Sequence, residues 1–462
     1  MMGRRRSMRG AAVALGAAIA VAAAGTGGGA QQAPRYDVVI RGGTLVDGTG
    51  APRRRADVAI AGDRIVAVAP AIAPGSARVI DATGLVVSPG FIDNHAHLVT
   101  LESHPLAENF VRQGITTIMA SLHSQDEPWP LDAYVSRVQM APNVGLFAGH
   151  TWIRRRVMGL ANRAPTPAEL AHMQALVDSS MRQGALGLAT GLEYVPASFA
   201  ATEEIIALAK VAATHRGIYV THMRDEGVRL IESVREALRI GAEAGMPVLI
   251  NHIKATGASQ FGASARALAL IDSATGAGGR VAFDLYPYTA FSTYADVMFP
   301  AWALADGAEA FARRVDDPAT RSRLVAEMIR IFPEQAGRGP ESIQFRELAT
   351  EPAMRGRTLA DYLAAHHRPV TIAGAVDALI ELQRAGGFIG IFHAMDQGDV
   401  DRYMRHPLAM FESDGDLVDR GAGFPHPRSI GAMPRVLGAA VRERGVLTLE
   451  AAIHKMTAQP AA

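Results

Sequence analysis

Pro89-Gly90-Phe91-Ile92-Asp93-Asn94-His95-Ala96-His97 is the stretch that decides the fold: a short apolar segment that runs directly into two histidines. The segment from Phe91 to Asn94 is typical of a buried strand. Residues two apart in a strand point to the same side, so His95 and His97 face the same way at its end. Such a pair is also compatible with two polar loop residues, but its place at the end of an apolar strand predicts a metal site.

Beyond this strand, further apolar strands alternate with segments of helical periodicity. The later strands are expected at Ile115–Ser121, Val144–Ala148, Leu186–Leu192, Ile218–Thr221, Val248–Asn251, Val281–Leu285 and near Phe411. Repeated strand–helix units indicate a parallel sheet, and eight of them favour a closed α/β barrel of the (β/α)8 TIM type. A doubly wound open sheet is the alternative. Residues 300–390 show mostly helical patterns.

One of the helices is specified in detail by its first residues. Thr166 suits the N-cap, Pro167 the first helical position, and Glu169 completes a capping box. Gly184 is expected to end this helix.

The N-terminal residues divide into a leader and a small β module. Residues 1–30 are predicted to be a signal peptide, because arginines precede an alanine-rich apolar stretch and Gly28-Gly29-Ala30 suits cleavage. An uncleaved membrane anchor is the alternative. Residues 31–88 hold short strands separated by turns and predict a small β-sandwich module, which leaves residues 89–462 for the barrel. A cleaved leader predicts a periplasmic or extracellular protein.

Composition excludes several classes of protein and site. The sequence contains no cysteine, which excludes disulfides, thiolate nucleophiles and cysteine-ligated zinc. The formal net charge is +1, and no basic stripe points to a nucleic-acid partner. No later segment is long and apolar enough to span a bilayer, so no membrane contact is expected after the leader is cleaved. Any metal must therefore be held by histidine, carboxylates, carbonyls or a modified lysine.

Four further residues follow predicted strands and extend the hypothesis of a metal site. His222 and His252 close the fifth and sixth strands, and neutral imidazole is a preferred zinc ligand. Asp414 follows the last strand, as a ligand and proton acceptor or as a plain turn aspartate. Glu193 follows the fourth strand, as a ligand that bridges two metals or as a solvated loop acid. Because the carboxyl ends of barrel strands meet at one mouth, we expect these side chains to converge with the first two histidines.

A site of this kind predicts hydrolysis by an activated water. Zn²⁺, as one or two ions, or another divalent metal would lower the pKa of its water to about 7. Asp414 would accept the proton and pass it to the leaving nitrogen of an amide, which leaves poorly until it is protonated. Arg428, in the loop after this aspartate, is a candidate clamp for a substrate anion.

These motifs resemble the metal-dependent amidohydrolases, and within them the N-acyl-D-amino-acid deacylases, or D-aminoacylases. The likeness runs from about Asp37 to the last residue through Gln113–Thr117, Gly184–Tyr194, Thr221–Glu226, His252–Lys254, Tyr286–Ala290, Ser413–Gly415 and His426–Arg428. The resemblance implies a hydrolase that cleaves the amide bond of a small N-acylated amino acid or a related amide. It implies metal binding by His95, His97, His222 and His252, catalysis by Asp414, and substrate contacts from Lys254, Tyr286 and Ser292, with the lysine on the substrate carboxylate.

Two departures from the family pattern bear on the site and on stability. D-aminoacylases typically carry a metal-binding cysteine after the second strand; here His123 takes that register, as a replacement ligand or a loop histidine, and Glu193 is the preferred substitute. The family also continues past the helix around Lys455 with strands that complete the small β module, whereas this sequence ends at Ala462. We therefore expect unpaired edges in that module, with lower stability, a partner that covers the edge, or a longer natural chain.

Two other functions stay open. One is a different amidohydrolase reaction, such as opening a cyclic amide as dihydroorotase-like enzymes do, or cleaving a dipeptide, with the same metal and base. The other is a non-catalytic binding protein on an inherited barrel. The sequence is also compatible with a homo-oligomer.

Overall fold

The computed structural model describes residues 35–98, 100–120, 129–421 and 423–462. The predicted signal peptide and His123 lie outside the described residues. The described residues divide into two compact units, one containing residues 35–42 with Ala56–Asp81, and the other containing Gly43–Arg55 with the described residues from Ala82 to Ala462. Of the helices described, none has the length and apolar character that a membrane span requires.

The first unit is a four-stranded sheet in the order β5-β4-β1-β6. Its strands are β1 (Val38–Arg41), β4 (Asp57–Ala61), β5 (Arg64–Ala69) and β6 (Arg78–Asp81). Val39, Ala59 and Ile72 form its small buried core. Ile65 on β5 and Val79 on β6 are 67% and 47% exposed. Within the described residues, each of these edge strands pairs with one neighbour only, the exposure that makes a sheet edge prone to pair with other chains.

The second unit is built on parallel strands that follow one another in chain order. They are β8 (Phe91–His97), β9 (Ile115–Ala120), β10 (Asn143–Leu146), β11 (Ala148–Gly149), β12 (Gly187–Gly191), β13 (Ile218–His222), β14 (Val248–Ile250), β15 (Val281–Leu285), β19 (Ala409–Phe411) and β20 (Gly415–Asp416). One sheet has the order β10-β9-β8-β20 and the other β11-β12-β13-β14-β15-β19. Only Phe147 separates β10 from β11, and the amide of Asp414, between β19 and β20, donates to the carbonyl of His95 at 2.9 Å. Eight strand positions thus succeed one another, and each predicted strand overlaps an observed one.

A small three-stranded sheet, β3-β2-β7, belongs to this unit as well: β2 (Thr44–Leu45), β3 (Arg54–Arg55) and β7 (Val86–Val87).

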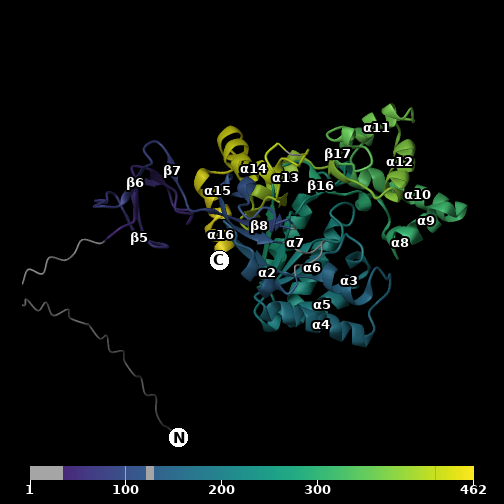
Figure 1. Cartoon of the computed structure of the whole chain (residues 1–462), viewed down its shortest axis with the longest axis horizontal. Coiled ribbons are helices and arrows are strands. Elements are labelled where there is room, and N and C mark those ends of the chain that lie inside the picture. The colour runs from purple at the N-terminus through teal and green to yellow at the C-terminus, as the bar shows by residue number, and fades with distance from the viewer. Residues whose placement is uncertain (1–34, 99, 121–128, 422) are drawn as a thin grey trace, which may run out of the picture. The chain divides into compact units, whose positions relative to one another are not determined.

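Helices connect these strands, and neighbouring helices pack in chain order (Figure 1). They are α1 (Glu108–Val111), α2 (Leu131–Arg137), α3 (His150–Met158), α4 (Pro167–Arg182), α5 (Thr202–Thr214), α6 (Leu230–Ala244), α7 (Ser264–Gly276), α13 (Gln397–Arg405), α14 (Arg428–Arg435), α15 (Leu449–Met456) and α16 (Ala458–Ala461). Helix α4 begins as predicted: the Thr166 hydroxyl accepts from the Glu169 amide, and the Glu169 carboxylate accepts from the Thr166 amide at 2.7 Å. The helix ends at Arg182, two residues before Gly184.

Between β15 and β19 lies an insertion with a sheet and a core of its own. Its elements are β16 (Phe291–Tyr294), α8 (Ala301–Leu304), α9 (Ala308–Asp316), α10 (Pro318–Gln335), β17 (Ile343–Glu347), α11 (Leu359–Ala365), α12 (Ile372–Arg384) and β18 (Ile389–Phe392). The antiparallel sheet has the order β16-β18-β17 and packs with the helices around buried Phe332, Phe345 and Leu379. The helical content of residues 300–390 was expected, whereas the strands were not.

Glu204 on α5 lies in a buried ionic cluster beside the barrel. Its Oε1 is 2.9 Å from Nε2 of His150, and its Oε2 contacts the guanidinium of Arg154. Arg154 also donates to the carbonyl of Arg163 at 2.7 Å. Glu204 and Arg154 are almost fully buried, so each depends on the other for compensation of its charge. Burial lowers the pKa of His150, which contacts the same carboxylate as a neutral ring.

We expect Glu204→Gln to lower the free energy of unfolding by about 3–5 kcal/mol, because it leaves the buried Arg154 guanidinium without a countercharge. The matched control is Glu203→Gln on the same helix, which weakens only the exposed pair with Arg239 and costs about 1 kcal/mol or less. Urea unfolding of both variants measures the difference. Equal losses in the free energy of unfolding would show that the buried ion pair stabilises the fold no more than the exposed one.

Candidate metal centre

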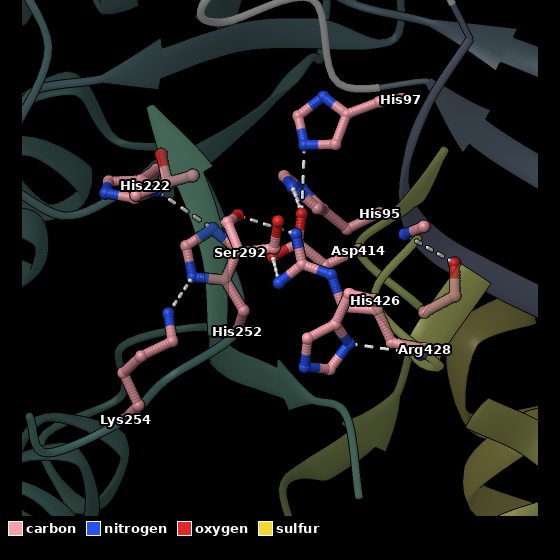
Figure 2. A network of polar contacts seen from close by, with 12 residues as sticks. His95, His97, His222, His252, Lys254, Ser292, Asp414, His426 and Arg428 are labelled. Carbon is pink, nitrogen blue, oxygen red and sulfur yellow. Dashed lines mark hydrogen bonds and ion pairs between the residues drawn. The ribbon is translucent and has the colours of Figure 1, made fainter. Parts of the chain in front are cut away.

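Four histidines from three strand ends converge at one mouth of the barrel (Figure 2). His95 and His97 come from the end of β8, His222 ends β13, and His252 lies just after β14. The ring centroids of His95 and His252 are 4.9 Å apart, those of His222 and His252 4.6 Å, and those of His95 and His97 5.4 Å. The structure therefore brings together the four histidines that the sequence singled out.

Asp414 joins this cluster from the turn between β19 and β20. Its Oδ1 is 2.9 Å from Nε2 of His97 and 3.4 Å from Nε2 of His95. Its Oδ2 is 2.7 Å from the guanidinium of Arg428 (Figure 2). The carboxylate thus has one oxygen toward the histidines and one toward a buried cation.

Two glutamates lie behind the other two histidines. Oε2 of Glu193 is 2.8 Å from Nε2 of His222, and Oε1 of Glu226 is 3.0 Å from Nδ1 of His252. Nδ1 of His222 and Nε2 of His252 face each other at 3.0 Å. Burial, and then the charge of Glu226, raise the pKa of Glu193 well above its usual range. Glu226 was part of a matching sequence motif, but its spacing from the histidines gave it no recognisable role.

Burial sets the protonation of the cluster. It lowers the pKa of His95 and of His222 to about 4, and the pKa of His252 falls well below its usual value through burial and the charge of Lys254. Burial alone would raise the pKa of Asp414, but Arg428 and the histidines outweigh it and hold that pKa well below its usual range. At neutral pH the three rings are neutral and the carboxylate is ionised, which is the protonation state that metal ligands need.

Two groups of described residues have ligand atoms close enough to hold a metal ion: His95, His97 and Asp414, and His222, Glu226 and His252. Imidazole nitrogen with carboxylate oxygen is a donor set that suits Zn²⁺. The two facing ring nitrogens at 3.0 Å also fit, because two lone pairs at this distance require a proton or a cation between them. Glu193 contacts the far side of the His222 ring and belongs to neither group.

The backbone beneath the site is held by two buried aspartates. Asp93 accepts from the amide and the hydroxyl of Ser413 at 2.9 and 2.5 Å, and Asp284 accepts from the amide of His252 at 2.5 Å. Burial raises the pKa of Asp93 to about 7 and that of Asp284 to about 8. His252 and Asp414 both have left-handed backbones, with φ of 36° and 46°. Such conformations cost about 1–3 kcal/mol and persist where the surroundings impose them.

A small cavity of about 60 Å³ opens next to the histidines, and three of the four predicted substrate-binding residues line it: Lys254, Ser292 and Arg428. Tyr286 is buried next to two of these residues, with Lys254 Nζ 5.7 Å and the Arg428 guanidinium 5.0 Å from its ring centroid. Arg428 also donates to the carbonyl of Ser292 at 3.0 Å. The predicted substrate residues therefore form one connected group.

Sequence analysis did not single out Arg346, which reaches the same cavity from β17 of the insertion. Its guanidinium is 2.6 Å from Asp416. His426 is a further buried residue without an expected role; its Nδ1 accepts from the amide of Arg428 at 3.1 Å and so steadies the start of α14. The place of Arg346 follows only from the pairing of distant elements.

Comparison with known proteins places this site in a family. A model described as "Amidohydrolase family" matches residues 78–462. The chain belongs to the amidohydrolase family. This amidohydrolase is 35% identical to the D-aminoacylase of Alcaligenes xylosoxydans xylosoxydans over 454 residues, which cover 92% of this chain and 84% of that protein. It is 36% identical to the N-acyl-D-aspartate deacylase of the same organism over 454 residues, which cover 92% and 81%.

A solved structure agrees with this assignment. The N-acyl-D-glutamate deacylase of Bordetella bronchiseptica, complexed with zinc and a phosphonate inhibitor that mimics the tetrahedral intermediate, matches with a TM-score of 0.76 and 30% identity over 93% of this chain and 85% of that one. The predicted family and α/β barrel class of this amidohydrolase are confirmed. It is a hydrolase of amide C–N bonds.

We expect Zn²⁺ to stabilise the amidohydrolase, because a ligand that binds only the folded state adds about 2.7 kcal/mol at 100 times its dissociation constant. Thermal unfolding after chelator dialysis, with and without added Zn²⁺, measures this. His252→Asn should lose most of the rise in Tm, while His172→Asn, at an exposed position on α4, should keep it. Identical rises in both variants would place the metal elsewhere.

Proposed function

We propose that this amidohydrolase is a metal-dependent deacylase of N-acyl-D-amino acids. The observation that carries the proposal is the convergence of four histidines and Asp414 beside a cavity lined by Lys254 and Arg428. The histidines and the carboxylate suit the cleavage of an amide, and the two cations suit a substrate that carries a carboxylate. The relatives named for this reaction act on N-acylated D-amino acids, which supports the same substrate class here.

In the proposed reaction, His95, His97, His222, His252 and Asp414 hold one or two Zn²⁺ ions, or another divalent metal. A metal ion in this place supplies Lewis acidity that activates water and polarises the amide carbonyl. Asp414 takes up the proton of the attacking water on its carboxylate and delivers it to the leaving nitrogen. Its place next to His97 on one side and Arg428 on the other keeps it ionised and aimed into the cavity.

The remaining residues bind and orient the substrate. Lys254 and Arg428 supply charge for the substrate carboxylate, Ser292 supplies a hydroxyl group, and the ring of Tyr286 lies against both cations. Charge-assisted hydrogen bonds to a carboxylate are roughly twice as strong as neutral ones. An acylated amino acid carries a carboxylate that Lys254 and Arg428 can contact beside their pairs with Glu226 and Asp414, which favours it over a cyclic amide that has none.

We also infer that the protein acts outside the cytoplasm. The support is the leader-like sequence of residues 1–30, with its basic start, apolar stretch and small residues at the end. The proposed division into this leader, a small β module at residues 31–88 and a barrel at 89–462 follows the same reading. Cell fractionation of a tagged chain, with N-terminal sequencing of the mature form, tests both.

The proposed function is tested by a substrate panel. The zinc-loaded protein should hydrolyse N-acetyl-D-amino acids, and should cleave their L counterparts, a cyclic imide and a β-linked dipeptide far more slowly. Ninhydrin detection of the released amine measures the rates. Preferred turnover of the cyclic imide or the dipeptide would replace the deacylase by one of those activities, and no turnover of any compound by metal-loaded protein would favour a binding protein.

We expect Asp414→Asn to lower kcat by about 100- to 10,000-fold, because the proton acceptor is lost. Asparagine also tolerates the left-handed backbone of this position, so the turn should survive. The control is Asp419→Asn, an exposed acid five residues along the chain, which should keep full activity. Steady-state kinetics at saturating metal provide the measurement, and an Asp414→Asn variant with wild-type kcat would assign the base elsewhere.

A further inference from the structure

An irregularity in β17 accompanies the place of Arg346 at the cavity. Phe345 pairs with Gly390 and Glu347 pairs with Ile389, so Arg346 is the extra residue of a bulge in the strand. Bulges change the direction in which a side chain points, and they are common next to active sites. The Arg346 side chain is mostly buried, and it lines a cavity that three of the histidines also line.

One acid neutralises the guanidinium of Arg346. Its Nη1 lies 2.6 Å from Oδ2 of Asp416 on β20. The main chain of Asp416 is held by other contacts: its amide donates to the hydroxyl of Ser429 at 3.1 Å, and its carbonyl accepts from the side-chain amide of Asn109 at 2.9 Å. The main chain therefore keeps the end of β20 in place, while the side chain serves the ion pair.

This ion pair differs in place from the other charges of the cavity wall. Among the described residues that line the cavity, three are lysine or arginine, and each contacts a carboxylate. The pairs are Lys254 with Glu226, Arg428 with Asp414, and Arg346 with Asp416. The first two adjoin the histidines and supply the contacts to the substrate carboxylate in the proposed reaction. The third joins the insertion to β20 and is left for another part of the substrate.

The contacts of Ser292 indicate which part of the substrate this is. Its carbonyl accepts from Arg428 at 3.0 Å, and its hydroxyl lies 3.5 Å from Nη1 of Arg346. Because both arginines contact one residue, a substrate whose carboxylate lies at Arg428 has its side chain within reach of Arg346. Phe291 on β16 and Ile389 on β18 line the same cavity with apolar side chains.

We propose that Asp416 and Arg346 determine the side-chain specificity of the enzyme: as an ion pair they form a neutral subsite that takes an N-acyl-D-amino acid with an uncharged, apolar side chain. An acidic side chain would meet Asp416 as a like charge and would compete with it for Arg346, and such repulsive elements are a common source of specificity. An apolar side chain leaves the ion pair intact. The inference rests on the proposed function and deepens it by naming the class of side chain.

The test changes the charge of the subsite in both directions. The measured quantity is the ratio of kcat/KM for N-acetyl-D-leucine to that for N-acetyl-D-glutamate, which should favour the leucine compound in the zinc-loaded wild type. Asp416→Asn leaves Arg346 unpaired and should shift the ratio about tenfold toward the glutamate compound, the effect of one hydrogen bond to a charged group. Arg346→Gln leaves Asp416 unpaired and should shift the ratio the other way. The double variant carries neither charge and should return toward the wild-type ratio.

Two further variants are controls. Arg346→Lys keeps the charge and should keep the preference for the leucine compound. Asp419→Asn, at an exposed position three residues after Asp416, should leave the ratio unchanged. A general disturbance of the site would slow both compounds alike, so shifts of opposite sign report the charge itself, and each single variant gives its own sign if the other does not fold. A wild type that prefers the glutamate compound, or single variants that shift the ratio in the same direction, would overturn the proposal.

Failure of the proposed function gives a different result. A zinc-loaded protein that hydrolyses neither compound would refute the deacylase, and calorimetric binding of the same two compounds to the wild type and both single variants would then measure the preference of the subsite. Tighter binding of the leucine compound, reversed toward the glutamate compound in Asp416→Asn, would support the neutral subsite. Equal binding of both compounds, or binding of neither, would refute it.

Discussion

The mouth of the barrel depends on one electrostatic constraint: every charge buried there must have a partner. Asp414 pairs with Arg428 at 2.7 Å, and Glu226 pairs with Lys254 at 2.6 Å. An unpaired buried ion costs several kcal/mol, and each of these pairs joins different segments of the chain. The partners therefore hold one another in place, so that the site is arranged before any substrate arrives.

Buried aspartates also hold the backbone segments that carry the site residues. Asp93 on β8 binds both polar groups of Ser413, so the strand that carries two of the histidines is tied to the turn that carries Asp414. Asp284 on β15 binds the amide of His252 in the same manner. Both tethered segments contain a left-handed residue that is not glycine. Glycine would adopt this backbone without strain, so the strain at His252 and Asp414 accompanies side chains that the site uses.

The sequence was a good guide to the barrel and to the histidines for a simple physical reason. Buried parallel strands are short apolar runs, and the residue after each run lies at the common mouth, so His222 and His252 could be placed from local pattern alone. Glu226 and Arg346 could not, because their roles follow from pairing across distant elements. Sequence analysis did not predict the sheet of the insertion for a related reason. Strand β16 pairs with β18 nearly a hundred residues away, and local periodicity carries no information about such a partner. Glu193, expected as a metal ligand, lies beside the ring of His222 and outside both groups of potential ligand atoms, which only the three-dimensional arrangement shows.

The insertion also separates two tasks within one site. The barrel strands carry the histidines and Asp414, while β16 and β17 of the insertion bring Ser292 and Arg346 to the cavity. The insertion has its own apolar core around Phe332 and Phe345, so its inner residues can change without disturbing the barrel strands. One contact links the insertion to the metal centre: the side-chain amide of Gln335, at the end of α10, donates to Glu193, which contacts His222. A substitution at the cavity face of β16 or β17 should therefore change which substrate is preferred. A substitution of Gln335 should instead change the surroundings of His222, so this contact links the insertion to the metal centre.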